Sequence, residues 1–470
     1  MFDWVRTSPF KNAFTMHKHT LSILCSLLVL TGCTMIPKYE QPASPVGAQY
    51  PGVTQTNAGN AADLGWESVF TDERLKQLIH FALANNADYQ VAVMNVEQSR
   101  AQYRIARSGS FPSVSAGGSY KRSGDFTTTA ESWSASLGTT AYEVDLFGRV
   151  RSQNRQALET FFATAEAQRS VKISLVAEVA TEYFVLRQTE EQIKLAKDTL
   201  KSVEDSYALN KATFDAGASS ELDLRTAEGQ VQTAKINLLT YERSRAQAVN
   251  YLVLLIGQPL PSHLPAASPF NATNLVAEVS PGLPSELLER RPDILEAEHT
   301  LKAANANIGA ARAAFFPTIS LTANVGSQSS QMAELFAAGT GFWSFAPQIT
   351  LPIFTGGQNK AILDSAKVGQ RIDVVNYQKA IETAFREVAD ALVASSSYTS
   401  QIESEYKLIG AQQRRYELAN LRYRQGDDTY LNVLSAQQDL YNAQQDLLRA
   451  QFNRLSSQIS LYQALGGGWK

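Results

Sequence analysis

The sequence is poor in the residues on which metal, redox and nucleic-acid chemistry depend. Only two of its 470 residues are cysteine, Cys25 and Cys33. Because Cys25 lies in a segment that export would remove, the mature chain has neither a disulfide framework nor a cysteine zinc site. His80, His263 and His299 are too far apart to form a spaced ligand pair. A net charge of −3 supplies no basic field for phosphate, which argues against nucleic acid as a partner.

Long apolar runs are also missing. The mean hydropathy is −0.20 and charged residues make up 19% of the chain, which excludes a polytopic helical membrane protein. No nucleophile motif, phosphate-binding loop or ligand cluster is visible, so we expect neither an enzyme nor a bound metal or cofactor. The length suits two or three ordinary domains or one elongated one.

The N-terminus carries an export signal. The apolar run Leu21–Leu30 is too short to span a bilayer, which takes about 20 residues, and fits the core of a signal peptide. It ends in Leu30-Thr31-Gly32-Cys33, which resembles a bacterial lipoprotein box. Residues 1–32 are therefore predicted to be a lipoprotein signal, with Cys33 as the acylated first residue. Thr34, rather than Asp, then favours the outer membrane. An ordinary signal peptide is the alternative, and Met16 is a second possible start.

The rest of the chain contains an internal duplication. Shifted by 209 residues, the second half repeats the first at Tyr207 and Tyr416, at Gly217 and Gly426, and further along. Upstream the shift is 205, as at Asp88 and Asp293. We therefore divide the mature chain into a lipidated segment (33–62), a first repeat (63–257), a proline-rich linker (258–292) and a second repeat (293–470).

Each repeat contains one β-hairpin, predicted over 113–147 and 318–355. The alternation is cleanest in the second repeat, where Ile319, Leu321 and Val325 face one way and Ser320 and Asn324 the other. An apolar face opposite a small, polar face is typical of a membrane barrel wall with a wet interior. Half of a soluble sandwich is the alternative.

Very long helices complete each repeat. Arg149–Ala216 contains no glycine or proline and would be about 100 Å long as one helix. Heptad spacing runs through both repeats, as at Val179, Leu186 and Ile193. This predicts helical hairpins that turn near 217 and 426, after a shorter helical stretch at about Thr71–Ser108. A plain soluble coiled coil would explain these helices but not the four amphipathic strands.

Four strands cannot close a barrel by themselves. The smallest membrane barrels have about eight strands, and open edges cannot face lipid. The strands must therefore come from several copies, with two giving eight strands and three giving twelve. The strand pattern does not choose between these numbers, but the small, polar inner face favours a lumen.

Several motifs together resemble the outer-membrane efflux factors related to TolC, in the lipoprotein branch typified by OprM. They are the segments 30–39, 141–150, 282–293, 316–321 and 423–431. The resemblance implies a mixed α and β membrane protein: a homotrimer with a 12-stranded β-barrel, four strands per chain, continued by a 12-helix periplasmic barrel. It also implies N-palmitoyl and S-diacylglycerol groups on Cys33, a periplasmic adaptor protein, and an inner-membrane pump of the resistance-nodulation-division class.

The same resemblance implies a gate at the periplasmic tip of the helices. The candidate gate residues lie in Gly217–Asp223 and Gly426–Ser435, and are Asp223, Asp427, Asp428, Leu431, Asn432 and Ser435. The aspartates would form rings of like charge on a threefold axis, with Leu431 as an apolar plug. Related proteins often carry carboxylates at the positions of Asn432 and Ser435. Gly217, Ala218 and Gly426 are the candidate adaptor contacts. Ordinary turn and capping chemistry is the alternative for Asp427 and Asp428.

The function expected from these features is an outer-membrane exit duct for drugs or toxic small molecules. A duct of the same architecture for peptides, proteins or metal ions is the alternative. A structural lipoprotein coiled coil without a pore is a third reading.

Overall fold

The computed structural model describes residues 34–47, 49–50, 65–270, 276–277 and 287–467. It divides into two compact units. The first, here called the sheet unit, is drawn from Met1–Glu40, Ala101–Glu159 and Lys302–Ile372. The second, the hairpin unit, is drawn from Gln41–Arg100, Thr160–Leu301 and Asp373–Lys470. The signal segment 1–32, Cys33 and much of the predicted linker lie outside the described residues.

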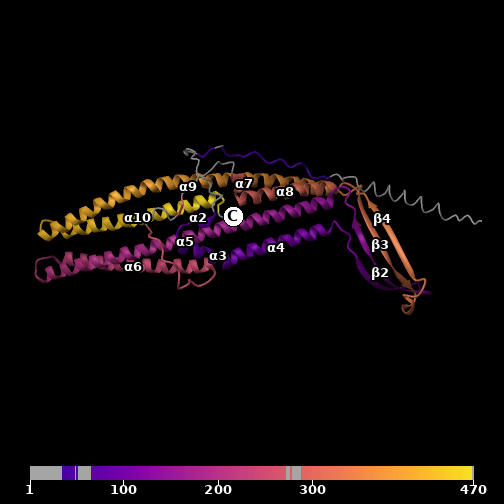
Figure 1. Cartoon of the computed structure of the whole chain (residues 1–470), viewed down its shortest axis with the longest axis horizontal. Helices are drawn as coiled ribbons and strands as arrows, with labels where there is room; N and C mark the ends of the chain where they lie inside the picture. The colour runs from indigo at the N-terminus through magenta and orange to yellow at the C-terminus, as the bar shows by residue number, and fades with distance from the viewer. Residues whose placement is uncertain (1–33, 48, 51–64, 271–275, 278–286, 468–470) are drawn as a thin grey trace, which may run out of the picture. The chain divides into compact units, whose positions relative to one another are not determined.

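Four antiparallel strands form the single sheet of the sheet unit as described, in the order β1-β2-β3-β4 (Figure 1). They are β1 (Ser115–Gly124), β2 (Thr129–Glu143), β3 (Thr318–Ser329) and β4 (Gly341–Thr350). The two predicted hairpins thus pair with each other through β2 and β3. β1 and β4 are left as edges.

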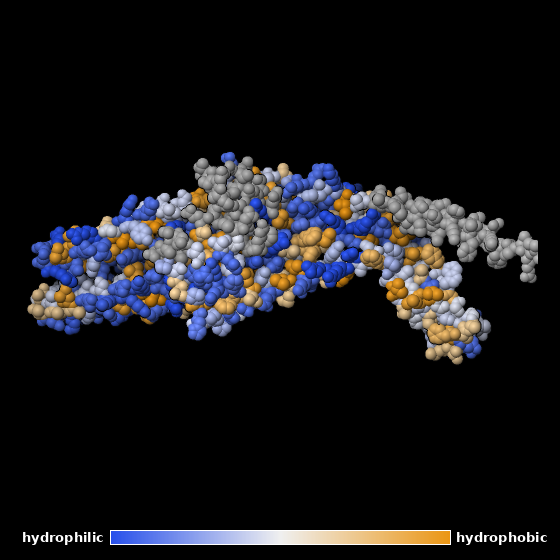
Figure 2. All heavy atoms as spheres, in the orientation of Figure 1, coloured by the Kyte–Doolittle hydropathy of each residue, from blue (hydrophilic) through white to orange (hydrophobic). Residues whose placement is uncertain are grey.

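The two faces of the sheet differ as the alternation predicts. On one face Ser119 Oγ lies 2.8 Å from Ser134 Oγ, and Gln328 donates to Ser132. The opposite face carries large apolar side chains that are half or more exposed in the single chain (Figure 2). These are Leu137, Val325, Trp343, Phe345 and Ile349.

Next to the sheet, the helices follow the order of the strands they join. α4 (Ala87–Ser108) leads into β1, α5 (Arg149–Asp215) follows β2, α8 (Pro292–Ala313) leads into β3, and α9 (Gln358–Gln425) follows β4. Neighbours in this order touch. A Cβ on Gly109 would lie 3.8 Å from Val150, and one on Gly309 would lie 2.7 Å from Ser152 Oγ. α8 and α9 share a small apolar cluster formed by Ile308, Ala311, Leu363 and Ala366. Like β1 and β4, α4 and α9 are edges.

In the hairpin unit, α5 folds back as α6 (Glu221–Ile256) and α9 folds back as α10 (Tyr430–Ala464) (Figure 1). α5 has 67 residues and α9 has 68, so each is about 100 Å long. The shorter helices are α2 (Trp66–Val69), α3 (Glu73–Asn85) and α7 (Leu287–Arg290). Among the described residues, none of the helices combines the length and apolar character needed to cross a membrane.

The continuous helix predicted over Thr71–Ser108 is broken at Asn86. Asn86 has an extended backbone, and its Oδ1 accepts a hydrogen bond from the Tyr89 backbone 2.9 Å away. Its Nδ2 donates to the Leu255 carbonyl at 3.0 Å. The side chain thus caps α4 and ties it to the end of α6. A long-range contact that the local pattern did not show decides this break.

The duplication is visible in three dimensions at this same point. In the second repeat the residue equivalent to Asn86 is Arg291, which donates to the Ala464 carbonyl at 2.9 Å. Ala464 is the equivalent of Leu255. Both repeats therefore fasten the start of a short helix to the end of a helical hairpin.

Candidate functional site

The α5–α6 turn is built around a left-handed glycine. Gly217 has φ +76°, its N–H bonds Phe214 O at 2.8 Å, and the N–H of Ala218 bonds Thr213 O at 2.9 Å. This pair of bonds defines a Schellman motif, which needs a residue without a Cβ in the left-handed position. Gly217 and Ala218 are exposed.

The α9–α10 turn repeats the motif. Gly426 has φ +81°, its N–H bonds Tyr423 O at 3.0 Å, and the N–H of Asp427 bonds Arg422 O at 3.0 Å. Gly426 and Asp427 are exposed. Both turns lie at the same end of the hairpin unit (Figure 1).

The helix that follows each turn is capped differently. At α6, Ser220 Oγ accepts from the Asp223 backbone at 3.1 Å and donates to the Asp223 carboxylate at 2.8 Å. At α10 the position equivalent to Asp223 is Asn432, whose amide donates to Asp428 Oδ1 at 2.6 Å. Ser220 is thus the N-cap of α6, with Asp223 bonded to it, whereas Thr429, the N-cap of α10, makes no side-chain cap hydrogen bond and Asn432 bonds Asp428 instead.

Asp428 is the acceptor at the centre of the second turn. Its Oδ1 also accepts from the Thr429 backbone at 2.8 Å, and Arg422 Nε lies 3.7 Å from its Oδ2. The Asn432 hydrogen bond, then the Thr429 one, and finally the Arg422 charge hold the pKa of Asp428 below its usual value. In the single chain this side chain therefore has a role in turn chemistry.

A pH dependence follows from that depressed pKa. Bonds to the ionised Asp428 stabilise the turn at all pH values above the ordinary carboxyl pKa of about 4, and are lost as pH falls through the lower folded value. If the turn belongs to the gate that the sequence predicts, its loosening should raise the conductance of the protein in planar bilayers below about pH 4. Asp428→Asn keeps the acceptor oxygen but cannot titrate, so its pH profile should be flat over this range. Identical profiles for the two proteins would show that Asp428 has no part in closure.

Each turn also exposes one leucine. Leu431, the candidate plug, is 66% exposed, and its equivalent Leu222 is 76% exposed. Sequence reasoning singled out Leu431 alone, although the 209-residue shift already matches the two. Each of the two helical hairpins therefore offers an exposed leucine for an apolar contact at its turn.

Ser435 lies one turn further along α10 and faces α9. Arg415 Nη2 is 3.4 Å from Ser435 Oγ, and Arg415 Nη1 is 2.5 Å from the Asp439 carboxylate. In the single chain Ser435 therefore belongs to a link between α9 and α10 within one hairpin.

A second link joins the two hairpins to each other. The Tyr423 hydroxyl on α9 donates to Asn210 Oδ1 on α5 at 2.9 Å. Asn210 is fully buried, and its amide donates to Ser206 O at 2.9 Å. Sequence reasoning proposed Tyr423 as a lock but missed Asn210. No local pattern distinguishes an asparagine inside a heptad region from a solvated one.

Tyr430 and Asp223 lie in the surroundings of the hydrogen bond between Tyr423 and Asn210. The rings of Tyr423 and Tyr430 lie 5.5 Å apart. Burial raises the pKa of Tyr430 to about 12, with smaller contributions from Tyr423, Tyr416 and Asp223. Burial, followed by the charge of Asp223, also raises the pKa of Tyr423. The charge of Asp223 on α6 thus acts on two tyrosines of the α9–α10 hairpin.

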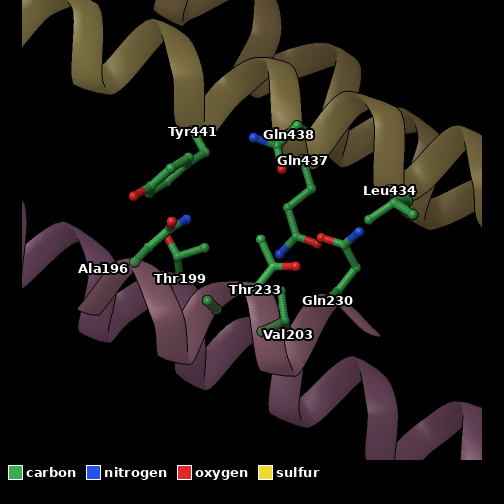
Figure 3. A pocket seen from close by; sticks show the side chains of 11 residues that line it. Ala196, Thr199, Val203, Gln230, Thr233, Leu434, Gln437, Gln438 and Tyr441 are labelled. Carbon is green, nitrogen blue, oxygen red and sulfur yellow. The ribbon is translucent and has the colours of Figure 1, made fainter. Parts of the chain in front are cut away.

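Further from the turns, the hairpins meet around a polar cavity (Figure 3). Its volume is about 20 Å³, enough for one water molecule. Gln437 reaches into it from α10, opposite Thr199 of α5 and Thr233 of α6. The Gln437 amide also donates to Ser202 at 3.1 Å. The two hairpins are thus joined here by a polar contact, and nearer the turns by an apolar cluster of Ala227 with Tyr430 and Val433. Within the first hairpin, Val203, Val231 and Ala234 form a separate apolar cluster.

Cys33, the predicted lipidation site, lies outside the described residues. Within the described part of the chain, no three His, Cys, Asp or Glu side chains are grouped so that they could hold a metal ion.

The comparisons agree with this architecture. The family model described as "Outer membrane efflux protein" matches residues 78–258 and 283–467, one match per repeat. The chain therefore belongs to the outer membrane efflux protein family.

Similar proteins cover almost the whole chain. The toluene efflux pump outer membrane protein TtgC of Pseudomonas putida is 47% identical, over 97% of this chain and 96% of its own. The cation efflux system protein CusC of Escherichia coli is 40% identical, over 95% and 98%. The open-state crystal structure of the Neisseria gonorrhoeae MtrE outer membrane channel has a TM-score of 0.88 at 42% identity, covering 93% of this chain and 99% of that one.

The protein is accordingly an outer-membrane efflux channel that extends into the periplasm, a transport protein rather than an enzyme. The predicted fold class is confirmed: a mixed α and β chain with an internal duplication and four strands per subunit, of the trimeric class with a β-barrel continued by a helical barrel. The reading as a coiled coil without a pore is wrong.

Proposed function

We propose that this protein is the exit duct of a tripartite efflux pump, and that its cargo is apolar organic compounds and antibiotics. The observation that carries the duct is that, among the described residues, the sheet and the helices joined to it each end in two open edges on one chain. Strands and helices end on the same two sides, β1 with α4 and β4 with α9.

Both helical edges expose apolar side chains beside the sheet. Ile105 of α4 is 71% exposed, and Ile372 of α9 is 55% exposed. Unpaired strand edges cannot face lipid, because each unsatisfied backbone group there costs several kcal/mol. Identical copies joined edge to edge, with β4 and α9 of one against β1 and α4 of the next, satisfy both requirements.

The small, polar inner face of the sheet favours a barrel made from three copies of the chain. Two copies would supply eight strands, and an eight-stranded barrel has room only for its own side chains. The face with Ser119, Ser134 and Gln328 carries small, hydrogen-bonded polar groups that favour water. With four strands per chain, a homotrimer gives a twelve-stranded barrel with a lumen. Acyl groups on Cys33, N-palmitoyl and S-diacylglycerol, would add a lipid anchor.

The channel needs two partner proteins, one that supplies energy and one that spans the periplasm. A channel confined to the outer membrane has no source of energy, so an inner-membrane pump must drive export and an adaptor must bridge the periplasm. We assign the adaptor contact to the exposed turns at Gly217, Ala218 and Gly426, together with Leu222 and Leu431. The pump is proposed to be of the resistance-nodulation-division class.

The choice of cargo rests on the relatives. Proteins named for toluene, solvent and antibiotic efflux are 43–47% identical to this chain, and the cation efflux relative is 40% identical. Metal-ion export through the same duct is the second candidate.

A charged residue at the proposed subunit seam tests the assembly and the function together. We expect Ile372→Asp to lose the heat-resistant trimer and to fail to restore toluene and antibiotic tolerance to a deletion strain, because burying an unpaired carboxylate is costly. Arg371→Asp places the same charge on the exposed neighbouring residue and should behave like the wild type. Restored tolerance to toxic metal cations without solvent tolerance would favour the metal-ion candidate. A trimer that survives Ile372→Asp would show that this edge is not the seam.

A further inference from the structure

The segment Thr34–Tyr39, here called the N-terminal strap, lies along α8 within the sheet unit. Asn305 Nδ2 donates to the Pro37 carbonyl at 2.8 Å, and Asn305 is only 6% exposed. On one side of it, Lys302 Nζ lies 5.2 Å from the centre of the Tyr39 ring. On the other, Arg312 Nη1 lies 3.4 Å from the Met35 carbonyl. Two backbone carbonyls of the strap thus accept hydrogen bonds from side chains that are spaced along α8.

A glycine in the middle of α8 makes room for the strap. A Cβ on Gly309 would lie 2.6 Å from Ile36 Cγ1 and 2.9 Å from Ile36 Cα, distances that a side chain cannot occupy. It would also lie 2.7 Å from Ser152 Oγ of α5, so the glycine makes room for both the strap and α5. Glycine inside a helix costs about 1 kcal/mol relative to alanine. The close approach of Ile36 explains why glycine is found at this position in spite of that cost.

The first repeat has no such surface. At the positions equivalent to Asn305 and Gly309, α4 carries Arg100 and Arg104, both exposed. Two large cations replace the amide and the glycine, and would block a strap there. The groove therefore belongs to the second repeat alone, and is not a by-product of the duplicated helix.

The order of these contacts shows in which direction the strap runs along α8. Tyr39 lies at Lys302, Pro37 at Asn305 and Met35 at Arg312, so the strap runs antiparallel to α8. Its Thr34 end lies where α8 leaves toward β3, which begins at Thr318. Cys33, which lies outside the described residues, directly precedes Thr34 in the sequence.

We propose that Asn305, Gly309 and Arg312 form a docking surface for the chain's own N-terminal strap, and that the docked strap holds the lipid-bearing residue at the sheet end of α8. Both membrane attachments, the anchor and the sheet, then lie at the same end of the helix. The docking itself does not depend on the proposed function. Only its consequence for the anchor rests on the lipid proposed for Cys33.

Thiol labelling tests the docking. The natural chain has no cysteine besides Cys25 and Cys33. In a background with both Cys25→Ser and Cys33→Ala, Ile36→Cys is therefore the one thiol, whether or not the signal segment is removed. We expect slow labelling by a water-soluble maleimide. Adding Gly309→Leu should accelerate it about tenfold, because the new side chain and the strap cannot share the space. Asn305→Ala should accelerate it several-fold without adding bulk.

Two controls complete the experiment. Gly369 is also a helical glycine, in α9, but a Cβ there meets nothing within 4 Å, so Gly369→Leu should leave Ile36→Cys protected. Lys38→Cys, at an exposed position of the strap, should label rapidly in every variant. Equal labelling of Ile36→Cys with and without Gly309→Leu would overturn the proposal. So would protection that appears only when Cys33 is present and acylated, because the membrane would then hold the strap. Neither outcome bears on whether the protein conducts.

Discussion

Tyr423→Phe is expected to make the closed channel leak. The hydroxyl of Tyr423 is the donor to Asn210, and this bond joins α9 to α5 close to the turns. Removing the hydroxyl leaves Asn210 Oδ1 buried without its partner, which costs about 1–3 kcal/mol. In the predicted gate the two hairpins separate as the tip opens, so this cost is expected to fall on the closed state. Each 1.4 kcal/mol changes a population about tenfold, so we expect the open fraction in planar bilayers to rise on the order of tenfold.

Tyr406→Phe is the matched control. Tyr406 likewise makes a hydrogen bond across helices, but as the acceptor, from Gln451 Nε2 at 3.1 Å. Both of these residues belong to the α9–α10 hairpin, so the same atom is deleted without loosening one hairpin from the other. Unchanged conductance in Tyr423→Phe, or an equal rise in Tyr406→Phe, would mean that the Tyr423–Asn210 bond does not hold the tip closed.

Arg291→Met is expected to destabilise the hairpin unit more than any surface change. Arg291 is 7% exposed and donates to Asp293 at 2.6 and 2.9 Å, to Glu387 at 2.9 Å and to the Ala464 carbonyl at 2.9 Å. Methionine fills much of the volume but leaves two carboxylates without their cation. The two carboxylates keep 36% and 40% of their side chains exposed, so water screens their charge. The main cost is the buried Ala464 carbonyl left without its donor, about 1–3 kcal/mol.

The measurement is the loss of helical circular dichroism on heating. Arg386→Met is the control, because Arg386 is an exposed partner of Asp390 at 3.9 Å, and such surface pairs contribute about 0–1 kcal/mol. Arg291→Met should lower the transition temperature clearly, and Arg386→Met should barely change it. Equal, small shifts would show that the Ala464 carbonyl finds water or another partner when Arg291 is removed.

Local patterns in the sequence determined most elements of the fold. The long stretch without glycine or proline up to Ala216 predicts α5, and the glycines at 217 and 426 predict turns, because a Schellman motif needs a left-handed residue. The alternation at Ile319–Gly326 predicts β3. Each of these is a property of neighbouring residues, so it can be seen without knowing what the segment packs against.

The tertiary structure alone decided which distant groups meet. Asn210 and Tyr423 are 213 residues apart, and Arg291 and Ala464 are 173 apart. Nothing in the local sequence marks these residues, because their roles depend on a partner that folding brings near. The same holds for the break at Asn86. Only the packed chain also shows that helices and strands share one order, which leaves the same two sides of the subunit open to its copies.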